Sequence, residues 1–194
     1  MTKDKLFIIS LGGSGTSFLR RVLVENLSLD LWFDPYPVFY AGTLTRTLLE
    51  QQGNKYLHMI LNDFEKNADG AKIALKPHYM ELEWMAFAQH FPNANYIFMK
   101  RNFEDAHKSL CQAELHTIAG SVSEAEYILA ARKLIKSFEA FHRNYRDSSI
   151  IIDYDKMIIK DSNEIDKIVE FTGVDRNVLS KSIKPPHNLT GLNR

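Results

Sequence analysis

Three glycines and three hydroxyl residues stand together near the start of the chain, in a loop formed by Gly12, Gly13, Ser14, Gly15, Thr16 and Ser17. Glycines let backbone N–H groups turn toward a ligand and approach it closely, and hydroxyls add further hydrogen-bond donors. We interpret the loop as a phosphate or sulfate site. A tight turn that binds nothing is the alternative.

The segments on either side of the loop support this interpretation. Residues 6–9 are an apolar run that predicts a buried strand, and apolar residues at helical spacing predict a helix over residues 16–27. The start of a helix adds unpaired N–H groups and the positive end of its dipole. The nucleotide-binding P-loop pattern requires Lys after its last glycine, whereas Thr16 follows Gly15 in this chain, which disfavours an ordinary ATP or GTP site.

Polar residues also follow the other predicted strands, over residues 71–76, 95–100 and 149–153. Lys76 and His78 end one strand, Lys100 and Arg101 end another, and Asp153 ends the last. Because the carboxyl ends of parallel strands meet at one edge of a sheet, these residues are expected to share a crevice with the glycine loop. The convergence of Lys76, Lys100 and Arg101 predicts a local positive charge there.

Each of these residues suggests a particular chemistry. Arg101 offers a planar fork of donors that suits a phosphate, and Ser109 lies eight residues later in a predicted helix, within reach of the same group. Lys76 and His78 are two apart in an extended segment, so both point to one face, where His can accept a proton and Lys can neutralise charge. The alternatives are a surface ion pair of Arg101 with Glu104 or Asp105, and a turn role for His78.

The elements that position these residues follow from periodicity and caps. Helices are predicted over residues 43–52, 56–64, 80–91, from near 104, 123–145, 163–172 and 176–182. Ser123 is the predicted N-cap of the longest helix, with Glu126 completing a capping box. Strands alternating with helices predict a three-layer α/β/α fold with a mainly parallel central sheet, in one domain over residues 1–194. The aromatic segment 29–40 either caps the core or lines a substrate pocket.

Composition narrows the classes of partner. Lys plus Arg equals Asp plus Glu, at 24 each among 194 residues, so no excess of positive charge indicates nucleic-acid or membrane binding, and any anion site must be local. The single cysteine, Cys111, excludes an intramolecular disulfide and fits a reducing compartment. The N-terminal apolar run of about five residues is too short for a secretory signal or a membrane span, so we expect a cytoplasmic protein.

In these features the chain resembles the sulfotransferases that use 3′-phosphoadenosine 5′-phosphosulfate (PAPS). Residues 11–17 resemble the family's 5′-phosphosulfate loop, and Arg101 with Ser109 matches its 3′-phosphate motif. Lys76, Pro77 and His78 resemble its strand-end Lys-x-His, and residues 152–157 and 171–174 are similar to two later segments. The resemblance implies a P-loop-NTPase-like fold, His78 as catalytic base beside Lys76, PAPS as donor without a metal, and a small-molecule, sugar or lipid acceptor carrying a hydroxyl or amine.

One position departs from that pattern. Gly13 stands where the family normally has Lys or Arg, so either Lys76, Arg20 or Arg21 substitutes, or the protein binds the nucleotide without efficient transfer. Two other functions therefore stay open. One is a P-loop-type small-molecule kinase, with Asp153 as a magnesium ligand at a strand end. The other is a non-catalytic nucleotide-binding or interaction protein on the same fold.

Overall fold

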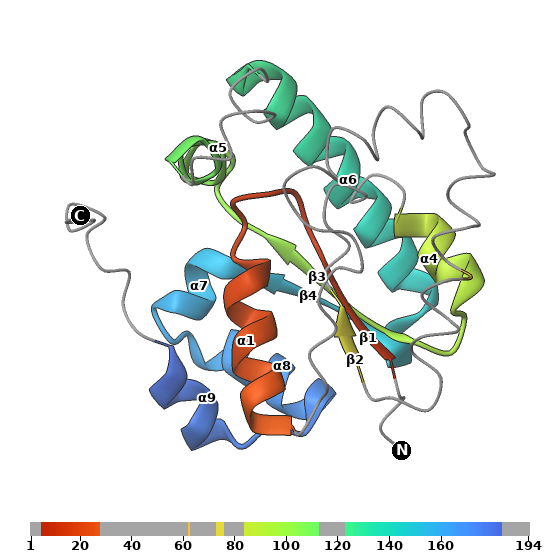
Figure 1. Cartoon of the computed structure of the whole chain (residues 1–194), viewed down its shortest axis with the longest axis vertical. Helices are drawn as coiled ribbons and strands as arrows, with labels where there is room; N and C mark the ends of the chain where they lie inside the picture. Colours follow the sequence, from red (N-terminus) through yellow and green to blue (C-terminus); the bar gives the residue numbers. More distant parts are fainter. Residues whose placement is uncertain (1–4, 28–61, 63–72, 76–83, 113–122, 184–194) are drawn as a thin grey trace.

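The structure is a computed structural model that describes residues 5–27, 62, 73–75, 84–112 and 123–183 (Figure 1). The aromatic segment 29–40, the helices predicted over residues 43–52 and 56–64 (apart from residue 62), and Lys76 and His78 lie outside the described residues. The described elements are β1 Lys5–Ile9, α1 Thr16–Leu27, β2 Ile73–Leu75, α4 Trp84–His90, β3 Asn95–Lys100, α5 Phe103–Gln112, α6 Glu124–Asn144, the 3-10 helix Arg146–Ser148, β4 Ser149–Asp153, α7 Tyr154–Ile158, α8 Ser162–Thr172 and α9 Arg176–Ser182.

The four described strands form a parallel sheet in the order β2-β1-β3-β4. In its register Ile9 lies opposite Phe98, and Lys100 lies opposite Asp153. The carboxyl ends of β1, β3 and β4 are therefore neighbours, and the residues that follow them meet at one edge. This confirms the predicted α/β class with a parallel central sheet.

Alternation along each strand divides the core into two layers. Leu6 and Ile8 of β1 and Ile97 of β3 face a cluster that α1, α8 and α9 complete through Leu19, Ile168 and Leu179, among other residues. Helices α1, α7, α8 and α9 accordingly lie together on one side of the sheet (Figure 1). Full burial of such aliphatic side chains stabilises the fold by about 1.5–3 kcal/mol each.

The opposite face of the sheet is aromatic. Phe98 of β3 stacks on Phe138 of α6 with ring centroids 4.3 Å apart, and Trp84 of α4 meets both rings edge-on. The Trp84 indole N–H donates to Ser137 Oγ at 3.1 Å, which satisfies the one polar atom of this buried ring. Helices α4 and α6 therefore cover this face (Figure 1).

The long helix α6 begins at the predicted capping box. Ser123 is its N-cap, the Glu126 N–H donates to Ser123 Oγ, and Ser123 N–H donates to Glu126 Oε2. These reciprocal bonds satisfy donors that a helix start leaves unpaired. The Ser123 hydroxyl also donates to Glu126 Oε2 at 2.7 Å, and this bond, followed by the one from the Ser123 N–H, holds the pKa of the Glu126 carboxyl below its usual value.

One helix, α7 (Tyr154–Ile158), was not predicted from the sequence; it starts directly after β4. Asp153 ends the strand and also caps this helix, accepting the Lys156 N–H at Oδ1. The buried Glu164 of α8 fixes the same junction, because its Oε2 accepts the Asp153 N–H at 2.9 Å. A helix of five residues is too short to show a clear period, so the N-cap Asp was its only sequence signal.

Candidate functional site

The glycine loop connects β1 to α1 and places two of its glycines in the left-handed region of backbone conformation. Gly13 and Gly15 adopt φ of +83° and +85°, values that L-residues with a side chain rarely adopt. The N–H groups of Phe18 and Leu19 both donate to Gly15 O at 3.1 Å, so α1 begins directly after the last glycine. Ser14 and Thr16 are buried, whereas Ser17 is exposed.

Helix α5 packs directly on this loop, at the carboxyl end of the sheet (Figure 1). A Cβ placed on Gly13 would overlap the carbonyl oxygen of Ala106, and one placed on Gly12 would lie 2.7 Å from Leu110 Cδ1. Position 13 therefore has no room for a Lys or Arg side chain while α5 is in place. The packing of α5 thus gives a steric reason why Gly13 stands where the resembled sulfotransferases have Lys or Arg.

Two side chains fix the loop by hydrogen bonds to its carbonyl oxygens. Tyr127 of α6 donates its hydroxyl to Gly12 O at 2.7 Å, and Arg101 donates Nη1–H to Gly13 O, also at 2.7 Å. The C=O and N–H of a trans peptide point in opposite directions. The Gly13 N–H therefore points away from the Tyr127 hydroxyl, and the Ser14 N–H points away from the Arg101 guanidinium.

Arg101 follows β3 and is held on three sides. Besides the bond to Gly13 O, its guanidinium carbon lies 4.7 Å from the centroid of the Tyr154 ring, and its Nε lies 3.7 Å from Asp155 Oδ1. Nε is buried and has no hydrogen-bond partner among the described residues, although 19% of the side chain is exposed. The guanidinium is therefore positioned by the protein and still reachable from solvent.

Carboxylates offset the positive charge that the sequence predicted at this edge. Lys100 Nζ lies 3.7 Å from Asp153 Oδ2, and Arg101 faces Asp155, which also accepts the Asn102 N–H at 2.6 Å. The ion-pair partner of Arg101 is thus Asp155 rather than Glu104 or Asp105. Sequence reasoning considered Asp153 only as a possible magnesium ligand and overlooked both pairings. The sequence showed one strand ending in Lys-Arg and another in Asp-Tyr-Asp, but not that the two strands are neighbours.

The remaining predicted site residues are placed as follows. Ser109 lies half-buried in α5, one position before Leu110 and three after Ala106, the two residues that pack on the loop. Arg20 and Arg21 lie in α1, half-buried and exposed respectively. The structure therefore brings Arg101, the loop and the helix carrying Ser109 together. Because β2 ends at Leu75, the structure describes neither Lys76 nor His78.

A small cavity of about 10 Å³ lies behind the loop, lined in part by Ser10, Ser14, Arg101 and Tyr127. A volume of this size holds one water molecule at most, so this cavity is too small for a nucleotide. In the described part of the chain no His, Cys, Asp and Glu side chains gather in a group of three that would suit a metal ion. None of the described helices is both long and apolar enough to span a bilayer.

Comparison with known proteins gives the family. Residues 46–177 match the Sulfotransferase family, which is more than half of the chain, so the protein belongs to the sulfotransferase family. The match begins after the glycine loop and includes Lys76, His78, Arg101 and Ser109. No curated protein matched the sequence.

Two solved structures are similar in fold. The sulfotransferase domain of the olefin synthase of Synechococcus PCC 7002 superimposes with a TM-score of 0.59 at 17% identity, covering 100% of this chain and 82% of that one. The sulfotransferase domain from the curacin biosynthetic pathway gives a TM-score of 0.57 at 14% identity, with 92% and 77% covered. At these identities the likeness establishes the α/β fold, and the family supports sulfuryl transfer as the general activity.

Proposed function

We propose that this protein transfers a sulfuryl group from PAPS to a hydroxyl or amine on an acceptor molecule. The observation that carries the proposal is the bond between Arg101, at the end of β3, and the glycine loop at the end of β1, in a chain of the sulfotransferase family. The hydrogen-bond donors of the site fit PAPS, because backbone N–H groups, a helix start and a guanidinium all favour the oxyanions that this nucleotide carries.

The geometry suits a ligand with two separate anionic groups. The Gly13 carbonyl and the Ser14 N–H belong to one peptide and point in opposite directions, so Arg101 and that N–H face opposite sides of it. One phosphate cannot occupy both places, whereas a nucleotide with a 3′-phosphate and a 5′-phosphosulfate carries two groups. In our proposal residues 12–17 hold the 5′ group, and Arg101 and Ser109 hold the 3′-phosphate.

The transfer itself is assigned to residues that follow β2. His78 accepts the proton of the acceptor hydroxyl or amine, and Lys76 neutralises charge on the group being transferred. PAPS, when bound, supplies the activated sulfuryl group. Both residues lie within the family match, and β2 pairs with β1, which leads into the glycine loop.

Gly13 gives a second candidate function some weight. A preorganised cation in the loop contributes on the order of 10² in rate, and α5 leaves no room for one at position 13. Lys76, Arg20 and Arg21 are the proposed substitutes, and without one of them the protein would bind the nucleotide and turn over slowly. The kinase alternative loses support, because Asp153 already caps α7 and pairs with Lys100.

The domain organisation, the location and the acceptor class are proposed from the composition of the chain and from its family. One domain over residues 1–194, a cytoplasmic location and a small-molecule, sugar or lipid acceptor fit a neutral chain with a single cysteine. Neither a nucleic-acid partner nor a metal is part of the proposal.

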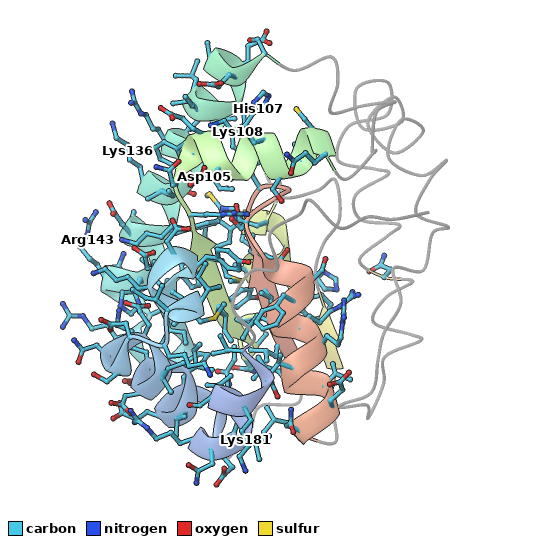
Figure 2. The ribbon with its side chains drawn as sticks, turned by 90° about the vertical axis from the view of Figure 1, so that its left-hand side faces the viewer. Asp105, His107, Lys108, Lys136, Arg143 and Lys181 are labelled. Carbon is cyan, nitrogen blue, oxygen red and sulfur yellow. The ribbon has the colours of Figure 1, made fainter. Side chains whose placement is uncertain are left out.

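The test is transfer from labelled PAPS to a panel of phenols, sugars, amines and lipid alcohols. We expect turnover with one acceptor class in the parent protein and none in His78→Ala, with nucleotide affinity nearly unchanged. Arg143→Ala, at an exposed position on the outward side of α6, is the control for removing a cation (Figure 2). Equal turnover in His78→Ala and the parent would remove His78 from the mechanism.

A further inference from the structure

We propose that Tyr154 is the positioning residue of this site, and that its ring holds the Arg101 guanidinium against the glycine loop. The inference rests on the proposed function, in which Arg101 binds the 3′-phosphate. Tyr154 suits this role because the fold fixes both its backbone and its ring.

Tyr154 is fixed at its backbone from two sides. It is the first residue of α7 and follows Asp153, which caps the helix through Lys156 N–H. The N–H of Asp153 in turn donates to the buried Glu164. No loop separates the strand from the helix, so the direction of the Tyr154 side chain is set by the sheet and by α8.

The Tyr154 ring lies between the two parts of the proposed site. On one side its centroid is 4.7 Å from Arg101 Cζ, within the range of a cation–π contact. It also covers Gly15, since a Cβ placed on that glycine would overlap the ring carbons. The ring therefore occupies the space that a side chain at position 15 would take, and one group touches both loop and cation.

Positioning by a ring has a chemical advantage at this site. Arg101 has a carboxylate, Asp155, 3.7 Å from Nε, and a stronger bond to that carboxylate would compete with an incoming phosphate. A flat aromatic face holds the guanidinium by its plane and leaves the in-plane N–H donors directed at its edges. Tyr154 thus orients the cation without occupying a donor that the ligand needs.

The first test compares affinities for adenosine 3′,5′-bisphosphate, measured by calorimetry. Replacing the ring in Tyr154→Leu is expected to weaken binding by about 3- to 30-fold, the range that cation–π contacts span. Tyr154→Phe keeps the face and should bind within about twofold of the parent. Tyr145→Leu is the matched control, because Tyr145 precedes β4 at the opposite end of the strand and is 52% exposed. A Phe variant as weak as the Leu variant, or a Leu variant as tight as the parent, overturns the proposal.

The second test needs no ligand, because it detects the contact between Tyr154 and Arg101 in the free protein. The Arg101 Nε–Hε signal in a ¹H–¹⁵N spectrum, assigned by its loss in Arg101→Lys, should carry the ring-current shift of Tyr154. We expect the shift to persist in Tyr154→Phe and to disappear in Tyr154→Leu. If the parent does not bind the bisphosphate, the proposed function fails and this spectrum alone decides the positioning role. A signal at the ordinary arginine position in the parent overturns it.

Discussion

The close packing of α5 on the glycine loop leads to a prediction about Gly13. Replacing Gly13 with Ala forces an L-residue into φ of +83°, which costs about 1–2 kcal/mol. The new Cβ also overlaps the Ala106 carbonyl oxygen, and overpacking of this kind costs a further 1–3 kcal/mol or so. The free energy of unfolding should therefore fall by about 2–5 kcal/mol in total.

Gly173 provides a matched control for the backbone part of that cost. It adopts φ of +76° at the C-cap of α8, and a Cβ placed there meets nothing within 4 Å. Gly173→Ala should therefore lose only the conformational part, about 1–2 kcal/mol. Chemical unfolding followed by circular dichroism gives both values. Equal losses in the two variants would refute the packing of α5 on the loop, and with it the steric explanation for the missing loop cation.

The same packing makes Gly13→Lys a variant that lowers bisphosphate affinity and turnover, even though it supplies the family's cation; a rise in turnover, measured with labelled PAPS, would show that α5 can move aside. Ser123→Ala should lower the free energy of unfolding by about 0.5–2 kcal/mol through loss of the α6 N-cap. Ser162→Ala, at an exposed position of α8 whose cap is Asp161, is the control and should leave stability nearly unchanged. The pKa of Glu126 is lowered in the folded protein, so its contribution is present above the pKa of the unfolded chain and is lost as pH falls through the folded value. In acid titrations of stability, Glu126→Gln should therefore lose less than the parent between neutral pH and pH 3 or so, and parallel curves would contradict the capping role.

The fold was largely predictable because local signals agreed with the tertiary arrangement. The helix after the glycine loop was predicted over residues 16–27 and is α1, Thr16–Leu27, and the strand over residues 95–100 is β3, Asn95–Lys100. The Ser123 capping box also formed as expected. In each case the apolar period, a glycine or a cap residue indicated the same boundary.

The site was predictable only in part, because contacts between strands depend on their order in the sheet. The sequence placed Arg101 and the glycine loop at one edge, and the bond between Arg101 and Gly13 lies there. It could not show that β4 lies beside β3, so the pairing of Asp155 with Arg101 was missed. Nor could it show that α5 lies over Gly13, because helix packing on a loop leaves no period in the sequence.

The most direct test of the central claim is a calorimetric titration with adenosine 3′,5′-bisphosphate, run beside ATP with magnesium. We expect the bisphosphate to bind and Arg101→Ala to weaken it by about 1.5–3 kcal/mol, the range for hydrogen bonds to charged groups, with Arg143→Ala unchanged. Binding of ATP with magnesium in place of the bisphosphate would contradict the account and favour a kinase. Binding of neither would leave a sulfotransferase fold whose glycine loop holds no nucleotide.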